Sequence, residues 1–272
     1  MKQVSATIVH KSTPLPEPHL SHGREILCIQ LIWLSCPEIA REAKPGQFVM
    51  VCCGEECTLP RPFSIHQVNE KGDMALFFVV WEDGRGTRWL SQRKVGDNID
   101  LFGPLGNGYS IHPDSHNLLL LAAGIGIAPL YFLAQEAINQ EKTLRILLGA
   151  SNPTHLYPRH LLPPDAELII TTEDGTVGKR GKITDFLPDF ADRADQVFAC
   201  GPAPMYRDMA LKKQELKLEG KPVQVSLEVR MGCGRGVCYG CTVKTKSGLK
   251  QVCTDGPVFD LDDVLWDELN CY

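Results

Sequence analysis

Residues 118–129 read Leu-Leu-Leu-Leu-Ala-Ala-Gly-Ile-Gly-Ile-Ala-Pro, and this stretch decides the fold of the second half of the chain. The apolar run is typical of a buried strand in a parallel sheet, and the glycines after it are typical of a tight turn into a helix. Pro129 stands where the dinucleotide-binding fingerprint has its third glycine, and proline is tolerated at the first position of a helix. The stretch predicts a strand, a turn and a helix whose N-terminus suits a pyrophosphate, with a turn that serves only packing as the alternative.

Residues 113–217 continue this pattern of apolar runs alternating with helical ones. That order predicts a Rossmann-like, doubly wound parallel sheet. The second expected strand ends in Gly149-Ala150-Ser151, without the acidic residue that holds a ribose 2′-hydroxyl, so NAD and NADP both stay open. We expect strands at residues 117–123, 145–148, 167–171 and 196–200, and helices at residues 130–139, 182–190 and 204–218.

The two flanking stretches differ from this one. Residues 1–112 carry short β-type runs separated by turn signals, which predicts an antiparallel barrel or sandwich. Residues 218–272 are too few to bury a large core, so a staple is expected there. The sequence therefore predicts three domains, at residues 1–112, 113–217 and 218–272. The β-type runs of the first domain are residues 25–33, 47–52, 74–81 and 98–102.

Composition narrows the class of protein. With 272 residues, 43% hydrophobic and 22% charged, the chain has ordinary globular usage, which excludes a largely disordered protein. Its 28 Lys and Arg against 33 Asp and Glu give a net charge of −5, which argues against a nucleic-acid partner. The N-terminus has no apolar signal segment, and glycines and Pro129 interrupt the longest apolar stretch. We expect a cytoplasmic protein with no membrane span.

Four of the 11 cysteines are clustered as C-x4-C-x2-C-x11-C, at Cys233, Cys238, Cys241 and Cys253. This is the plant-type ferredoxin spacing for a 2Fe–2S cluster. Interleaved glycines let backbone N–H groups approach cluster sulfurs. A structural zinc site is the alternative, but such sites usually show two C-x2-C pairs and only one is present here. Cys52, Cys53 and Cys57 are expected to be inert thiols, because adjacent residues of a strand point to opposite faces.

Three shorter motifs are weaker signals. Arg61-Pro62-Phe63-Ser64 offers an arginine fork for a diphosphate and a hydroxyl for a ring nitrogen. Gly86-Thr87 opens an expected helix and offers donors to phosphate. Cys200-Gly201-Pro202 follows an expected strand, where ligands of such sheets bind, although a buried cysteine before a helix is the simpler interpretation.

The order of these motifs resembles the ferredoxin-NADP reductase superfamily with an appended 2Fe–2S domain, over nearly the whole chain. Within it, the electron-transfer subunits of class B dihydroorotate dehydrogenases are most similar. Further stretches carry that likeness: residues 45–49 (Pro-Gly-Gln-Phe-Val), 228–233 (Glu-Val-Arg-Met-Gly-Cys) and 253–259 (Cys-Thr-Asp-Gly-Pro-Val-Phe).

The resemblance implies an FAD-binding barrel, an NAD-binding domain and a cluster domain. Members of the family often carry Tyr-Arg where this chain has Val80-Trp81, so the packing around the flavin is expected to differ. By this likeness, FAD would contact Arg61, Pro62, Phe63, Ser64, Val79, Val80, Trp81, Gly86 and Thr87; NAD would contact Gly124, Gly126, Pro129, Cys200, Gly201 and Pro202; and the cluster would be ligated by Cys233, Cys238, Cys241 and Cys253.

The function implied is electron relay in pyrimidine biosynthesis. An FMN-containing catalytic subunit would oxidise dihydroorotate, and electrons would pass through the cluster and FAD to NAD+, in a complex with two copies of each chain. Reductase subunits of other complexes, of the hydrogenase or the sulfide and ferredoxin-NADP oxidoreductase type, are the nearest alternative. A non-enzymatic scaffold stapled by zinc is the more distant one. No dihydroorotate site and no catalytic acid or base is expected on this chain.

Overall fold

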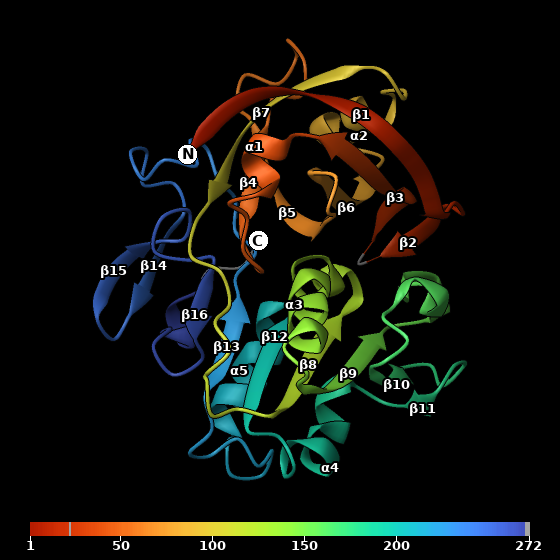
Figure 1. Ribbon diagram of the computed structural model, residues 1–272. Helices are drawn as coiled ribbons and strands as arrows, with labels where there is room; N and C mark the ends of the chain where they lie inside the picture. Colours follow the sequence, from red (N-terminus) through yellow and green to blue (C-terminus); the bar gives the residue numbers. More distant parts are fainter. Residues whose placement is uncertain (22, 270–272) are drawn as a thin grey trace.

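The computed structural model describes residues 1–21 and 23–269, and Figure 1 shows a barrel above a sheet layered with helices. In the barrel, β1 pairs with both β7 and β3, which closes the ring of antiparallel strands. The antiparallel barrel prediction is confirmed. The strands of this sheet are β1 (Lys2–Leu15), β2 (His19–Ser21), β3 (Arg24–Ser35), β4 (Phe48–Val51), β5 (Arg61–Val68), β6 (Asp73–Trp81) and β7 (Asn98–Leu105), with the short helices α1 (Pro37–Ala40) and α2 (Arg85–Ser91) between them.

The sequence pattern did not indicate β1 or β5. Strand β1 alternates apolar and polar residues only over residues 3–8, where Ala6 and Ile8 are buried, and the rest of the strand shows no such pattern. Strand β5 contains Pro62, and a proline normally counts against a strand. Pro62 nevertheless lies opposite Met50 of β4, in a register that continues to Ser64 opposite Phe48. The motif at residues 61–64 is therefore part of the barrel wall.

The second sheet has the order β11-β10-β9-β8-β12-β13-β16, and all its pairings are parallel except the last. This confirms the predicted parallel sheet. Helix α3 (Ile127–Asn139) packs on one face, while α4 (Leu187–Ala191) and α5 (Ala203–Leu211) pack on the other. The strands are β8 (Asn117–Ala123), β9 (Thr143–Ala150), β10 (Glu167–Thr172), β11 (Lys179–Arg180), β12 (Gln196–Cys200), β13 (Val223–Ser226) and β16 (Val258–Asp260).

The helices differ from the expected ones at their ends. A 3-10 turn, η1 (Gly124–Gly126), precedes α3, so Pro129 is the third residue of that helix and not the first. A proline at the third position is tolerated because the first four N–H groups of a helix have no acceptor within it, so the N–H that proline lacks would make no helical hydrogen bond. The helix expected at residues 182–190 begins as a 3-10 turn, η4 (Ile183–Phe186), before α4. Helix α5 ends at Leu211, because the polar run after it buries only Leu216 and Leu218.

The last stretch of the chain joins the second sheet. Strand β13 pairs with β12 and β16 pairs with β13, so the expected boundary at residue 217 separates strands of one sheet. A hairpin of β14 (Thr242–Thr245) and β15 (Gly248–Gln251) lies outside that sheet, and a 3-10 turn, η5 (Trp266–Glu268), follows near the end. The apolar side chains of the last stretch, Val243 and Val252 among them, pack in one cluster with residues of α5 and of the barrel. Residues 218–269, the described part of this stretch, therefore have no core of their own.

His66 ties the barrel to the second sheet. It lies fully buried on β5, where its Nδ1–H donates to the Ala128 carbonyl of α3 at 3.0 Å. The Tyr157 hydroxyl, which follows β9, donates to its Nε2 at 3.0 Å. Burial lowers the pKa of His66 to about 4, so the ring is neutral at physiological pH.

None of the described helices has both the length and the apolar character that a membrane span requires.

Candidate functional site

The cysteine loop, residues 233–241, connects β13 to β14 and lies against the barrel. Cys241 and Cys253 are buried, Cys233 is half-buried and Cys238 is exposed. A Cβ on Gly234 would come within 2.5 Å of Met50 Cγ, so the loop backbone sits directly on β4. The loop is therefore in contact with the strand that pairs with the Arg61–Ser64 motif.

Backbone N–H groups point at the thiols. The Arg235 N–H donates to Cys233 Sγ at 3.3 Å, and the Gly236 N–H donates to Cys253 Sγ at 3.2 Å. Gly236 has a φ of 73°, a conformation that glycine adopts without strain. Burial tends to raise the pKa of Cys233, but N–H donors from Arg235 and its neighbours outweigh it and lower the pKa to about 6. The loop therefore stabilises a thiolate before any metal binds.

The four thiols interact with one another, as a shared metal site requires. Cys233 interacts with Cys238, and Cys253 interacts with Cys241 and with Cys233. The N–H groups directed at Cys233 Sγ and Cys253 Sγ are of the kind that surrounds and tunes an iron–sulfur cluster. These residues therefore fit a 2Fe–2S cluster.

The cysteines of the barrel lie apart from this loop. Cys52 is exposed, while Cys53 and Cys57 are buried in the barrel core. Burial raises the pKa of Cys53 to about 12, which keeps this thiol protonated. The burial of Cys53 and Cys57 agrees with their interpretation as buried inert thiols, whereas Cys52 is exposed and does not fit it.

On the barrel, the structure brings two of the sequence motifs together. A Cβ on Gly86, in the first turn of α2, would lie 2.7 Å from Arg61 Cγ, so the helix start packs on the arginine stem. The Arg61 Nη1–H donates to the Leu59 carbonyl at 2.6 Å, and the Thr87 hydroxyl donates to the Gly84 carbonyl at 3.2 Å. The guanidinium and the start of α2 therefore lie at one place on the barrel.

Other residues of these motifs point elsewhere. Phe63 and Val80 are buried in the barrel core. Val79 and Trp81 lie on the opposite face of β6, against the apolar cluster of the second sheet. The Arg24 guanidinium stacks 4.3 Å from the Trp81 ring centre. Phe63 and Val80 thus shape the barrel wall from inside, while Val79 and Trp81 face outward.

At the second sheet, the turn after β8 touches the turn after β12. A Cβ on Gly126 would lie 2.0 Å from the Cys200 carbonyl oxygen, a distance that no side chain can tolerate. The contact follows from the pairing of the two strands, in which Ala122 lies opposite Cys200. The glycine motif and the Cys200-Gly201-Pro202 motif therefore form one site at the carboxyl edge of the sheet, where such folds bind ligands.

Glu228 is a site residue that the motif analysis did not assign to any role. Its Oε1 lies 3.9 Å from Cys200 Sγ, which is buried and also lies 3.9 Å from the Ser226 carbonyl oxygen. The Glu228 side chain is reached by solvent, yet the protein around it removes enough water to raise its pKa. Burial also raises the pKa of Cys200 well above its usual value. Glu228 lies two residues beyond β13, and only the pairing of β12 with β13 reveals its place.

The backbone of two acidic residues that follow β10 lies at the end of β9. The Glu173 N–H donates to the Ala150 carbonyl at 3.1 Å, and the Asp174 N–H donates to the Ser151 carbonyl at 3.3 Å. A hydrogen bond from the Thr176 N–H lowers the pKa of Asp174 and keeps it ionised. Two acidic residues thus lie next to the end of β9, whose own sequence has none there, and they come from the segment after β10.

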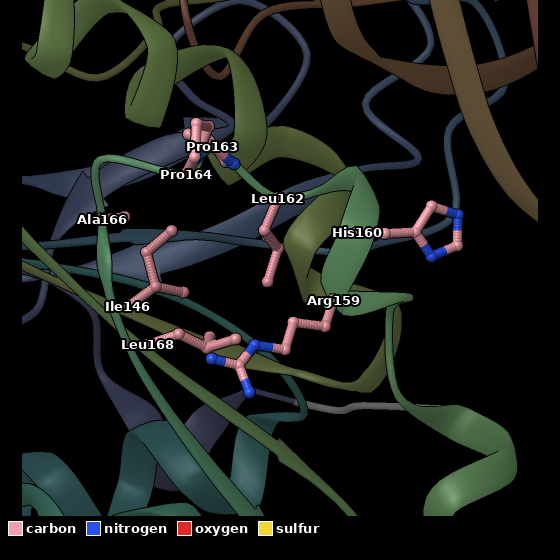
Figure 2. Close-up of a pocket in the computed structure, with 8 residues that line it drawn as sticks. All are labelled: Ile146, Arg159, His160, Leu162, Pro163, Pro164, Ala166 and Leu168. Atoms are coloured by element: carbon pink, nitrogen blue, oxygen red, sulfur yellow. The ribbon is translucent and has the colours of Figure 1, made fainter.

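A pocket of about 720 Å³ lies away from all of these residues. Figure 2 shows it between a short loop carrying Arg159 and the face of β9 and β10, with Ile146 and Leu168 as its floor. These two residues pair with each other, Ile146 in the middle of β9 and Leu168 as the second residue of β10, away from the carboxyl edge. The pocket is open because two 3-10 turns, η2 (Pro153–His155) and η3 (Arg159–Leu161), stand where an α-helix would cover the sheet.

Comparison with protein families agrees with this division. Residues 20–109 match the oxidoreductase FAD-binding domain, which confirms the predicted FAD-binding barrel. Residues 228–265 match the iron–sulfur cluster binding domain of dihydroorotate dehydrogenase B and contain all four clustered cysteines. The cluster prediction is confirmed, and the zinc alternative is not supported.

Individual relatives and a solved structure match the chain over most of its length. The dihydroorotate dehydrogenase B (NAD(+)) electron transfer subunit of Desulforamulus reducens is 39% identical, over 85% of this chain and 90% of that protein. The protein of the same name from Geobacillus thermodenitrificans is 35% identical, over 85% and 91%. A chain in the structure of NADH-dependent reduced ferredoxin-NADP oxidoreductase is 30% identical with a TM-score of 0.83, over 98% of this chain and 91% of that one. The chain belongs to the family of dihydroorotate dehydrogenase B electron transfer subunits.

Proposed function

We propose that this chain relays electrons between an FMN-containing dihydroorotate dehydrogenase catalytic subunit and NAD+, in the cytoplasm, as a step of pyrimidine biosynthesis. Bound flavin exchanges hydride with nicotinamide and single electrons with a 2Fe–2S cluster, which is why both groups are needed. The observation that carries the proposal is the position of the cysteine loop against the barrel. It packs on β4, and β4 pairs with the strand that holds Arg61 and Ser64.

For FAD, the barrel residues divide into contacts and support. We assign the diphosphate to the Arg61 guanidinium and the start of α2 at Gly86 and Thr87, because these groups converge there. The outward-facing residues Pro62, Ser64, Val79 and Trp81 would line the flavin. Phe63 and Val80 would hold that wall in shape from the core.

For NAD, the site would be formed by the two turns that follow β8 and β12 and contact each other. Gly124, Gly126 and Pro129 would face the pyrophosphate through the start of α3, and Cys200, Gly201 and Pro202 would border the nicotinamide. Glu173 and Asp174, whose backbone N–H groups bond the end of β9, would favour a ribose 2′-hydroxyl over a 2′-phosphate, because like charges repel. This supports NAD as the preferred nucleotide.

For the cluster, the ligands would be Cys233, Cys238, Cys241 and Cys253. We retain residues 1–112, 113–217 and 218–272 as the three functional segments for FAD, NAD and the cluster, although the last two share a sheet. Around Cys238 the surface is apolar: Val237, Tyr239 and Leu59 are 71%, 66% and 51% exposed. Exposed apolar groups of this kind suit a partner interface, and we assign them to the catalytic subunit, in a complex of two copies of each chain.

A second candidate rests on the likeness to NADH-dependent reduced ferredoxin-NADP oxidoreductase, which extends over nearly the whole chain. In that case the partner would be a reductase subunit and not a dihydroorotate dehydrogenase.

Reconstitution distinguishes the two candidates. The purified chain, carrying FAD and the cluster, is mixed with the dihydroorotate dehydrogenase catalytic subunit of the same organism, and NADH formation from dihydroorotate and NAD+ is followed at 340 nm. We expect activity only when both chains are present. A chain that contains both groups and oxidises NADH, but forms neither a complex nor NADH with that subunit, would favour the second candidate.

A further inference from the structure

Tyr206 makes two hydrogen bonds through one buried oxygen. The side chain is 1% exposed and comes from the first half of α5. Its hydroxyl accepts from the Gly201 N–H at 2.8 Å and donates to the Ser226 carbonyl at 2.7 Å. Gly201 lies in the turn after β12, and Ser226 is the last residue of β13. The hydroxyl therefore joins the turn that follows one strand to the end of the neighbouring strand.

This bridge lies where the parts of the NAD site meet. Gly201 follows Cys200, whose carbonyl oxygen is in contact with Gly126, and Ser226 precedes Glu228 by two residues. Cys200 already lies opposite Ser226 in the pairing of β12 with β13. Beyond this pair the chain leaves the ladder, and the Leu227 N–H donates to the Pro257 carbonyl instead. The Tyr206 hydroxyl thus links the chain that follows β12 to β13, one residue beyond the last pair of the two strands.

We propose that Tyr206 is a positioning residue for nicotinamide: its hydroxyl fixes the Cys200-Gly201-Pro202 turn relative to Gly126 and to Glu228. The inference rests on the proposed NAD site at this turn. Without the hydroxyl, the Gly201 N–H and the Ser226 carbonyl lose their partner in a buried place, and the turn gains freedom to move. Hydride transfer requires the nicotinamide and the flavin to be close together and correctly oriented. A small displacement of the bound nicotinamide therefore slows the transfer strongly.

Tyr109 offers a matched control. It is also buried, and its hydroxyl donates to the Ala199 carbonyl of β12 at 3.1 Å, one residue before Cys200. Tyr109→Phe therefore removes a buried hydroxyl that bonds β12 from the segment between β7 and β8, but that hydroxyl does not hold the amide of the turn. A merely structural effect of losing such an oxygen should appear in both variants.

The experiment compares Tyr206→Phe and Tyr109→Phe in the chain loaded with FAD and cluster. NAD+ affinity is measured by calorimetry, flavin reduction by NADH in a stopped-flow instrument, and amide exchange of the peptide containing Gly201 by mass spectrometry. For Tyr206→Phe we expect roughly tenfold weaker NAD+ binding, slower flavin reduction by NADH and faster exchange of that peptide. Reduction by dithionite and the flavin spectrum should stay unchanged. Tyr109→Phe should match the wild type in NAD+ affinity.

The outcomes separate the inference from the proposed function. Wild-type NAD+ affinity and flavin reduction rate in Tyr206→Phe would overturn the inference, as would equal losses in both variants. If the wild-type chain binds no NAD+, the proposed function fails together with the inference. Should Tyr206→Phe fail to fold, 3-fluorotyrosine at position 206 changes the strength of both hydrogen bonds with little change in size. It should alter NAD+ affinity there and not at position 109, and equal affinities at the two positions would contradict the inference.

Discussion

Gly126 lies against the carbonyl oxygen of Cys200 so closely that a Cβ on the glycine would stand 2.0 Å from that oxygen. Neither residue can move alone, because Gly126 is the N-cap residue of helix α3 and Cys200 ends β12 in a paired ladder. The contact fixes the distance between the two turns that would hold the nucleotide.

Gly126→Ala should therefore impair NAD+ binding while the barrel and the cluster loop stay intact. The two turns must separate to admit the methyl group, and we expect hydride transfer from NADH to slow by roughly 100-fold. Gly220→Ala, outside the proposed NAD site, is the comparison. Its Cβ would meet nothing within 4 Å, and its φ of 72° costs an alanine about 1–2 kcal/mol. Stopped-flow flavin reduction in both variants tests the prediction, and equal rates would contradict it.

Cys238→Ser should remove the cluster and leave FAD in place. Serine is a poor ligand for iron, and Cys238 is exposed, so the substitution disturbs no core packing. We expect the cluster absorption and the iron content to fall to background while the flavin bands persist. Cys52→Ser, at an exposed cysteine outside the loop, should keep both groups. Loss of FAD together with the cluster would show that the loop and the barrel site are not separable.

Arg61→Ala should weaken FAD binding by about 10- to 100-fold, the range expected for loss of a charge-assisted hydrogen bond to phosphate. The guanidinium has its stem fixed by Gly86, so it is already oriented for this contact. Arg41→Ala removes an exposed arginine outside the site and serves as the control. Titration of the flavin-free chain with FAD, followed by quenching of flavin fluorescence, gives both affinities. Equal affinities in the two variants would remove Arg61 from the site.

Local pattern was sufficient for the parts of the fold that depend on neighbouring residues. The apolar run at residues 118–123 and the turn at Gly124 predict their structure, because a buried strand and a tight turn are determined by a few adjacent side chains. The spacing of the four cysteines predicts the cluster for the same reason, since most of its ligands lie within one loop.

Features that depend on strand pairing could not be predicted in this way. The contact of Gly126 with Cys200, the place of Glu228 and the bridge made by Tyr206 all require the order β8-β12-β13. The acidic residues next to the end of β9 come from after β10 for the same reason. Strand β1 was missed because its side chains are mostly polar, and its position is set by pairing with β3 and β7.

The buried His66 should make the stability of the chain depend on pH in a defined window. Its pKa is about 4 in the folded chain, against an ordinary value of 6.5 when unfolded. Above pH 6.5 the ring is neutral in both the folded and the unfolded chain, and its full contribution to the free energy of unfolding is present. As the pH falls from 6.5 to 4, the unfolded chain takes up a proton that the folded chain refuses, so stability is lost, in total by about 3 kcal/mol.

Urea unfolding of the chain at pH 7.5, 6.0 and 5.0 measures this loss. His66→Gln should lower stability at pH 7.5, because the Ala128 carbonyl and the Tyr157 hydroxyl lose the imidazole between them. The same variant should flatten the pH dependence between 6.5 and 4, because glutamine does not titrate. His160→Gln, at an exposed histidine, should leave the wild-type pH dependence in place. A slope that persists in His66→Gln would assign the acid sensitivity to other groups, and the contact between β5 and α3 would then not be its source.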